Sequence, residues 1–391
     1  MLFLCIAALL LVLSNIYDIR NYQKNKTQWY NIILLVLIFF AGLKYHLGGD
    51  NYSYLYYFYN IYPSLKDYTI DDFAVGRDPL YALINSLVKD YGGRFYIVQF
   101  IHATFLNVLI FRYFKKHSRY IFTCVFFYFI TCYFHYNAEV LRASLAIVIC
   151  LYGNDYIKEK KWIKGFILYG VALFCHAQTL LIFILPLLFR LKLDYRGYII
   201  LLVAFVFSFS IKNIFNNYLF VLDNMDNLQT KAEMYVDSDV YGSGSTSLGG
   251  LLVYLMPILY LFYSSHYLKK KGITDTLEFI EPFVFLGILF TIFSYNMPIF
   301  YRYTDYFRIY FVIIFTEFFV RLSASSYNFK NGYCLVKSVF FYIPFFFIIT
   351  VSMLDKTAYI RYFPYTSIIN KEIVQERERI FNDVGVKPSD Y

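Results

Sequence analysis

Long apolar runs follow one another along almost the whole of this chain, separated by short basic or acidic stretches. Of its 391 residues, 59% are hydrophobic and only 16% are charged, whereas soluble domains carry about a quarter of charged residues. An α-helix needs about 20 predominantly apolar residues to cross a bilayer. The runs therefore predict an all-α polytopic membrane protein with about 12 transmembrane helices, and they leave no length for a separate soluble domain.

The bounds of the apolar runs give the expected helices. They cover residues 2–17, 30–43, 95–112, 120–135, 138–156, 163–175, 178–190, 197–214, 249–267, 276–296, 299–321 and 334–353. The stretch 163–190 is too long for one crossing, and the polar turn at His176 divides it into two short helices or a re-entrant pair. Residues 1–354 are thus expected to form a single transmembrane domain, followed by a polar tail, 355–391, that is helical or disordered.

The charges between the runs predict the topology. Lysine and arginine dominate the short connections, for example Lys158–Lys164, and the positive-inside rule places such connections in the cytoplasm. The two longest connections, about 44–94 and 215–248, carry several aspartates and glutamates and are expected to face outward. This assignment leaves both termini, including the tail, on the outer side. Within the first outer loop, residues 78–90 have the apolar spacing of a short amphipathic helix.

The composition argues against several other classes of function. The net charge is +9, but the basic residues are scattered between apolar runs rather than gathered, so nucleic-acid binding is not expected. The six cysteines lie within apolar runs without metal-ligand spacing, so neither a metal ion nor another cofactor is expected. The glycine-rich stretch 242–250 lacks the ending of a phosphate loop and is expected to be a hinge.

Ionisable residues within the expected membrane helices gather toward the outer side. Inserting such a residue costs several kcal/mol, so each one suggests a function. Arg142 lies about one turn into its helix, and Glu139, three residues earlier, is its expected supporting carboxylate. His176 lies in the outer turn that follows the next helix.

Two arginines and one aspartate open the expected helix 299–321. Arg302, Asp305 and Arg308 fall within an arc of about 120°, so they line one face of that helix. Arginine forks bind phosphate oxygens and stabilise the charge that builds on a leaving group. Together with Arg142, this face suits a lipid-linked pyrophosphate, with Asp305 in support. The alternative is an ion-pair cluster that only holds helices together.

Two residues are candidates for accepting a proton. A histidine side chain titrates near neutrality, so His176 can take a proton from a sugar hydroxyl, although a lone histidine in a membrane protein more often hydrogen-bonds a helix end. Asp50 lies in a Gly-Gly-Asp sequence of the first outer loop and is either a general base or part of a turn. Arg77 and Asp78 are likewise either functional residues or structural ones. The structural alternative is that Asp78 starts a helix, because an aspartate before a proline is a good helix start.

Tyrosines cluster where the first outer loop begins. They are Tyr52, Tyr54, Tyr56, Tyr57 and Tyr59. Such rings favour the interface between membrane and water, and they would also suit stacking against sugars.

Three segments together resemble a known family. Gly42–Tyr54 contains a Gly-x-Asp-x-x-x-Tyr pattern, Tyr136–Ala146 carries an asparagine followed by Arg142, and Ala172–Gln178 carries a Phe-x-His turn after a basic loop. In their order, spacing and membrane context, these segments are similar to the EpsG family of exopolysaccharide membrane proteins, which are regarded as Wzy-type polymerases.

The resemblance implies a membrane glycosyltransferase of the polysaccharide polymerase type. Its substrates would be undecaprenyl-pyrophosphate-linked oligosaccharide repeat units, joined into an exopolysaccharide, capsule or O-antigen at the outer face of the bacterial inner membrane. The growing glycan would pass from its carrier to the non-reducing end of an incoming unit. Because the substrate brings its own leaving group, no nucleotide is needed. The bilayer, a flippase and a chain-length regulator are the further partners of such an activity.

The expected mechanism is a metal-independent glycosyl transfer. Arg142, Arg302 and Arg308 would hold the pyrophosphate, His176 or Asp50 would deprotonate the acceptor hydroxyl, and the remaining candidates Glu139, Asp305 and Arg77 would support them. One alternative is another polyprenyl-phosphosugar-dependent glycosyltransferase, which usually places its carboxylate after the first helix. The other is a flippase or transporter of lipid-linked sugars, for which paired halves and mid-membrane charges would be expected.

Overall fold

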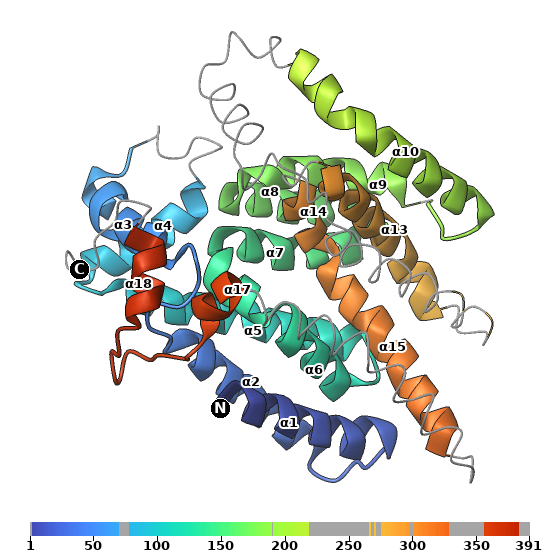
Figure 1. Ribbon diagram of the computed structural model, residues 1–391, viewed down its shortest axis with the longest axis horizontal. Coiled ribbons are helices and arrows are strands. Elements are labelled where there is room, and N and C mark those ends of the chain that lie inside the picture. The colour runs from blue at the N-terminus through green and yellow to red at the C-terminus, as the bar shows by residue number, and fades with distance from the viewer. Residues whose placement is uncertain are drawn as a thin grey trace. The chain divides into compact units, whose positions relative to one another are not determined.

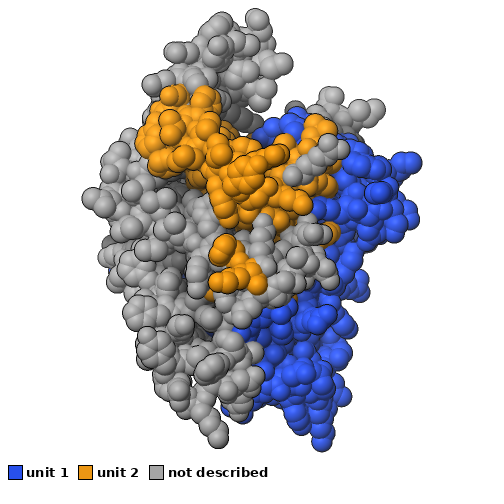
Figure 2. Space-filling model, turned by 90° about the vertical axis from the view of Figure 1, so that its right-hand side faces the viewer, with its two compact units in different colours: residues 1–184, 319–391 blue, residues 185–318 orange. Residues whose placement is uncertain are grey.

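Helices and turns make up the part of the chain that the computed structural model describes. That part comprises residues 2–69, 78–189, 191–218, 266, 270, 275–296, 300–327 and 356–382. Within it, the β pairing is an isolated antiparallel bridge between Lys44 and Ser367. The prediction of an all-α fold is therefore confirmed over these residues. The chain divides into two compact units, which are coloured separately in Figure 2.

Unit 1 consists of Met1–Ile184 and Phe319–Tyr391. Its helices are α1 (Leu2–Ser14), α2 (Lys26–Gly42), α3 (Asn51–Tyr56), α4 (Pro79–Asp90), α5 (Phe95–His117), α6 (Ile121–Thr131), α7 (Leu141–Lys158), α8 (Trp162–Cys175), α17 (Lys356–Tyr362) and α18 (Gln375–Asn382). Single π turns follow α1 (Asn15–Ile19) and α3 (Tyr57–Ile61) and precede α7 (His135–Glu139), and short 3-10 helices cover Leu65–Asp67 and Ala177–Ile184. Among these elements, α7 packs on α8, α2 on α5, and α1 on α6 (Figure 1).

The α7–α8 pair is closely packed because two glycines face each other across it. A Cβ on Gly153 would lie 2.7 Å from the Tyr169 ring and 3.3 Å from the carbonyl oxygen of Gly165, so a larger side chain would push the helices apart. Small residues of this kind let membrane helices approach closely. The connection between the two helices is short, so they run antiparallel. The first turn of α7 therefore lies near the last turn of α8.

Unit 2 consists of Leu185–Phe318. Its described elements are α9 (Leu185–Leu188), α10 (Tyr195–Tyr218), α13 (Asp275–Asn296), α14 (Tyr301–Thr304), the 3-10 turn Asp305–Phe307, and α15 (Arg308–Tyr327), which continues into unit 1. α10 packs on α13. Asn296 Nδ2 donates a hydrogen bond to Ser208 Oγ (2.7 Å), and the Phe283 and Tyr310 rings stack with centroids 4.3 Å apart.

Two helices among the described residues are long and apolar enough to cross a membrane, Leu2–Ile19 and Phe95–His117. Shorter apolar helices accompany them at Lys26–Gly42, Ile121–Thr131, Trp162–Cys175, Ala177–Leu188, Tyr195–Ser210 and Phe279–Ser294. The full count of about 12 spans and the single transmembrane domain stay predictions. Of the expected helices, 334–353 and almost all of 249–267 lie outside the described residues, as does the glycine-rich stretch 242–250.

Two expected breaks are confirmed and one unexpected break appears. α8 ends at Cys175 and His176 is extended, as the sequence predicts, and α4 begins at Pro79. The helix expected over 138–156 instead starts at Leu141, because Val140 interrupts it after the π turn His135–Glu139. This break places Arg142 in the first turn of α7.

Candidate functional site

The carboxylate of Asp78 joins three segments of unit 1. Its Oδ2 accepts a hydrogen bond from Arg142 Nη1 at 2.7 Å, and its Oδ1 accepts one from the backbone N–H of Ala177 at 3.2 Å. The Nδ1 atom of His176 lies 3.6 Å from the same Oδ1. With 5% of the Asp78 side chain exposed, this contact is almost fully buried. We call Asp78, Arg142 and His176 the outer cluster, after the side of the membrane that the sequence predicts for them.

The start of α4 directs the Asp78 carboxylate toward the other two helices. Pro79 is the first residue of α4, where a proline fits without losing a hydrogen bond. Asp78 adopts a left-handed conformation (φ 51°, ψ 57°), and its carbonyl accepts a hydrogen bond from Ala82 N. An aspartate before a helix commonly caps it with its side chain. Here the side chain makes no such bond, so the carboxylate is available to Arg142 and Ala177.

A tyrosine hydroxyl fixes the break before α7. Tyr54, on α3, donates a hydrogen bond to the Glu139 carbonyl and accepts one from the N–H of Leu141, both at 3.1 Å. The Glu139 carboxylate accepts a hydrogen bond from the N–H of Gly49 at 2.8 Å. Tyr54 thus satisfies backbone groups that Val140 leaves outside the helix. The position of Arg142 therefore depends on the Gly49–Tyr54 segment.

His176 lies directly after α8, with both ring nitrogens near polar partners. Nδ1 faces Asp78, and Nε2 lies 3.2 Å from Gln178 Oε1. Which nitrogen carries the proton depends on the tautomer, and a carboxylate beside Nδ1 favours a proton there. In that tautomer Nε2 is the basic nitrogen, and because Gln178 Oε1 is also an acceptor, the two atoms form a hydrogen bond only once Nε2 is protonated.

Aromatic rings surround the guanidinium of Arg142. Its central carbon lies 5.8 Å from the Tyr54 ring centroid and 6.0 Å from that of Tyr57, within the range of cation–π attraction. About a third of the Arg142 side chain is exposed (34%), and Tyr57 beside it and Tyr56, which contacts Tyr57, are exposed as well. The cation is therefore held by Asp78 yet remains accessible.

The surroundings favour an ionised Asp78 beside a protonated Tyr54. Burial raises the pKa of Asp78, but hydrogen bonding to His176 and the charge of Arg142 outweigh burial and hold the pKa below its usual value. Burial raises the pKa of Tyr54 to about 12, which keeps its hydroxyl available as a donor. The outer cluster is thus an ion pair with a histidine beside it at neutral pH.

The other candidates from the sequence lie in different surroundings. Asp50 is exposed at the start of α3, where its carbonyl accepts a hydrogen bond from Tyr54 N. In unit 2, Asp305 Oδ1 pairs with Arg308 Nε at 2.7 Å, and the Arg308 guanidinium lies 4.7 Å from the Tyr301 ring centroid. Arg302, in α14, is half-buried.

Arg77 lies outside the described residues. Its neighbour Asp78, which the sequence predicts equally as a functional carboxylate or as the start of a helix, forms the centre of the cluster. The sequence left both readings of Asp78 open, and the long-range contacts with Arg142 and Ala177 that distinguish them carry no local sequence signal.

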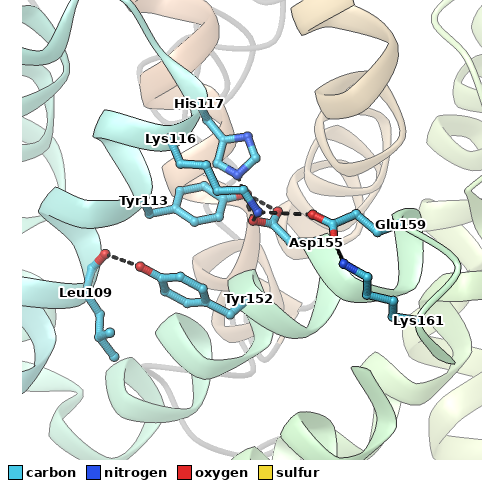
Figure 3. Close-up of polar contacts among 8 residues, drawn as sticks. All are labelled: Leu109, Tyr113, Lys116, His117, Tyr152, Asp155, Glu159 and Lys161. Atoms are coloured by element: carbon cyan, nitrogen blue, oxygen red, sulfur yellow. Dashed lines mark hydrogen bonds and ion pairs between the residues drawn. The ribbon is translucent and has the colours of Figure 1, made fainter. Parts of the chain in front are cut away.

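A second buried carboxylate lies at the opposite end of α7 (Figure 3). Asp155 Oδ2 accepts hydrogen bonds from Lys116 Nζ (2.7 Å) and His117 Nε2 (2.8 Å), and Tyr113 donates to Oδ1 at 3.4 Å. Asp155 is 2% exposed. All three donors come from the last turns of α5, so these four residues, the inner cluster, tie the end of α5 to the end of α7.

These features define an all-helical protein with apolar helices and a buried cluster of ionisable residues at helix ends, the type expected of a membrane protein. Residues 27–367 match the model of the EpsG family, and the chain belongs to this family. Membership implies a role in polysaccharide biosynthesis and, with the apolar helices, indicates a membrane location. All of the outer cluster lies within the matched range. No curated protein and no solved structure matches the chain.

Proposed function

We propose that this protein is a polysaccharide polymerase of the bacterial inner membrane. It joins undecaprenyl-pyrophosphate-linked oligosaccharide repeat units into a surface polysaccharide at the outer face. Family membership supports the pathway. The observation that carries the proposal is the outer cluster: an accessible arginine held by a buried aspartate, with a histidine on the same carboxylate.

In this proposal Arg142 binds the pyrophosphate of the donor. Guanidinium groups bind phosphate oxygens through paired, charge-assisted hydrogen bonds. The Asp78 contact fixes the orientation of the guanidinium before substrate arrives, so little reorganisation is needed when negative charge builds on the leaving group. The partial exposure of Arg142 supports access by a ligand.

His176, oriented by Asp78, acts as the general base. The acceptor hydroxyl oxygen attacks the anomeric carbon of the donor glycan, and the bond from that carbon to the pyrophosphate oxygen breaks. The hydroxyl proton passes to Nε2 of His176, and undecaprenyl pyrophosphate leaves with its charge balanced by Arg142. A carboxylate next to Nδ1 stabilises the protonated imidazole that results.

The exposed tyrosines beside Arg142 suit the sugar part of the substrate. Tyr57 lies next to the guanidinium and Tyr56 packs against Tyr57 edge to face, with ring centroids 6.2 Å apart. Their apolar faces and polar hydroxyls match sugar rings, which carry both kinds of surface. Tyr57 is therefore the residue on which we expect the first sugar to stack.

The remaining candidates keep their proposed roles. Arg302 and Arg308, supported by Asp305, keep the pyrophosphate-binding role expected from the sequence, and Asp50 is the alternative base. Glu139 supports Arg142 indirectly, since it binds the backbone of Gly49. A flippase and a chain-length regulator are the proposed partners.

The proposal is tested by deleting the gene and complementing it with wild type, Arg142→Ala, Arg142→Lys and Arg94→Ala. Arg94 is an exposed arginine on the same predicted side and serves as the control. We expect a polymer ladder with wild type and Arg94→Ala, and single lipid-linked repeat units with both Arg142 variants, because lysine lacks the bidentate fork.

Three other outcomes would contradict the proposal. Normal polymer with Arg142→Ala at matched protein amounts would remove Arg142 from the site. Unchanged chain length with a missing sugar would indicate a modifying glycosyltransferase. Repeat units trapped inside the cell would indicate a flippase.

A further inference from the structure

The segment 356–382, which contains α17 and α18, binds the start of the first outer loop. Figure 1 shows both helices in red, with α18 near α3 in this view. Tyr45 N donates a hydrogen bond to Thr366 O, and Ile368 N donates one to Leu43 O, both at 2.9 Å. These bonds flank the bridge between Lys44 and Ser367. A segment that the sequence describes only as a polar tail is therefore built into unit 1.

Arg377 anchors this segment although it is an arginine with only 1% of its surface exposed. Nε donates to Ile360 O and Nη2 to Pro364 O, both at 2.7 Å. Nη1 donates to Thr366 Oγ1 at 3.1 Å and to His46 O at 3.4 Å. A buried cation is costly unless its donors are satisfied. Here three carbonyls and the Thr366 hydroxyl accept from its donors, and the His46 carbonyl among them links the segment to the outer loop.

Glu378, the next residue, binds two side chains of the outer loop. One carboxylate oxygen accepts a short hydrogen bond from the Tyr52 hydroxyl and lies 3.2 Å from His46 Nδ1. Burial raises the pKa of Glu378, but its bonds to His46 and Tyr52 outweigh burial and lower the pKa overall. The carboxylate is thus ionised and fixes Tyr52 on α3.

Hydrogen bonds, linked by short stretches of the chain itself, connect this segment to the outer cluster. The N–H of Gly48 donates to Arg361 O at 3.0 Å, and the next residue, Gly49, donates to the Glu139 carboxylate at 2.8 Å. Tyr52 and Tyr54 share α3, and Tyr54 holds the N–H of Leu141, one residue before Arg142. Both routes, through Gly48 and Gly49 and through Tyr52 and Tyr54, connect the segment 356–382 to the backbone just before Arg142.

Gly48 shows how closely the loop approaches that backbone. Its φ is +96°, a conformation that favours glycine. A Cβ at this position would lie 2.5 Å from the carbonyl oxygen of Ala138 and 2.8 Å from the Ala138 Cβ. The loop therefore packs directly on the turn that precedes α7, with no room for a side chain between them.

We propose that the segment 356–382 is a clasp that positions Arg142 for glycosyl transfer, with Arg377 and Glu378 as its positioning residues. This inference rests on the proposed function, since it assumes that Arg142 acts on the substrate. The clasp acts through two points of the outer loop, Gly48 and Tyr52. It sets the orientation of Arg142 rather than contacting the substrate.

The test compares Glu378→Gln with Glu376→Gln in purified, bilayer-reconstituted protein supplied with lipid-linked repeat units. Glu376 lies on the same helix but is exposed, so the same chemical change should have no effect there. We expect Glu378→Gln to lower kcat about tenfold while KM stays within about twofold, the pattern of an interaction used in the transition state. Tyr52→Phe, a milder change to the same contact, should act in the same direction.

A double variant separates positioning from general destabilisation. If the clasp acts through the Tyr54 hydroxyl, Glu378→Gln should lower kcat by less than about twofold in a Tyr54→Phe background, because the path is already broken. Multiplying effects, or an unchanged kcat in Glu378→Gln and Tyr52→Phe proteins of normal thermal stability, would overturn the clasp. So would equal losses in Glu378→Gln and Glu376→Gln. Full activity of Arg142→Ala would instead overturn the proposed function.

Discussion

The two ends of α7 carry the same chemical groups in different arrangements. At each end a buried aspartate contacts a histidine and a basic side chain: Asp78 at the start of the helix, and Asp155 near its end. Arg142 and Asp155 are 13 residues apart on this helix, so the two clusters are separated by about 20 Å along its axis. Their composition alone does not distinguish a reactive site from a structural one.

The difference lies in which segments supply the partners. The donors to Asp155 all lie on the last turns of α5, so the inner cluster ties two helices together. Asp78 instead joins the starts of α4 and α7 to the end of α8, and it leaves Arg142 a third exposed beside exposed tyrosines. A site assembled from several helix ends, with an accessible cation, is the arrangement that can bind a substrate.

The largest expected effect comes from replacing the histidine of each cluster. His176→Ala removes the proposed base and should lower the transfer rate about 10²- to 10⁴-fold at unchanged protein amount. His117→Ala is the matched control and should leave the rate within a few-fold. Transfer measured with purified protein checks both. An equal loss of transfer rate in the two variants would contradict the assignment of the outer cluster as catalytic and the inner cluster as structural.

Replacing the inner aspartate should affect stability rather than catalysis. Asp155→Ala removes three hydrogen bonds, from Lys116, His117 and Tyr113, which costs about 1–3 kcal/mol of unfolding free energy. The half-exposed Lys116 can turn to water, so we expect the lower part of this range. Thermal unfolding in detergent, with Glu376→Ala as an exposed control, measures the loss. Normal stability would show that the cluster contributes little.

Substitution at Tyr57 should weaken substrate binding modestly. Tyr57→Ala removes a ring beside Arg142 and is expected to raise KM about two- to fivefold, in line with a contact of about 0.5–1 kcal/mol. Tyr57→Phe keeps the ring and should stay close to wild type. Tyr91→Ala, at a fully solvent-exposed ring, is the control. A similar KM for all three variants would remove Tyr57 from the sugar site.

The smallest effect is a dependence of stability on acid pH. The folded pKa of Asp78 lies below its unfolded value of about 3.9. Asp78 therefore stabilises the protein above that value, and this contribution is lost as the pH falls through the folded pKa. Unfolding measured between neutral pH and about pH 3 should show a smaller decline in Asp78→Asn than in wild type. An identical decline would contradict the ionised carboxylate.

The sequence predicted the parts of this site that depend on local signals. Pro79 starts α4 and the polar turn at His176 ends α8, because both are breaks in an apolar pattern. The charge pattern of the loops also predicts Arg142 and His176 on one side of the membrane. The sequence did not indicate the left-handed backbone conformation of Asp78, which leaves its carboxylate available to Arg142 and Ala177.

The long-range contacts were beyond the sequence. The break at Val140 depends on the Tyr54 hydroxyl, which lies more than 80 residues away. Arg377 and Glu378 stand in the charged run Gln375–Arg379, which has the composition of an exposed helix, yet both are buried against the outer loop. Such contacts form only when distant segments meet, so secondary-structure propensity and hydrophobic periodicity cannot predict them.

The most direct test of the central claim compares Asp78→Asn with Asp155→Asn in one transfer assay. Both substitutions remove a buried negative charge at an end of α7 and keep the side-chain shape. Polymer formed from lipid-linked repeat units by reconstituted protein is measured at equal amounts of folded protein. The account predicts a loss of about a hundredfold or more for Asp78→Asn and a rate near wild type for Asp155→Asn. Normal transfer by Asp78→Asn would contradict it.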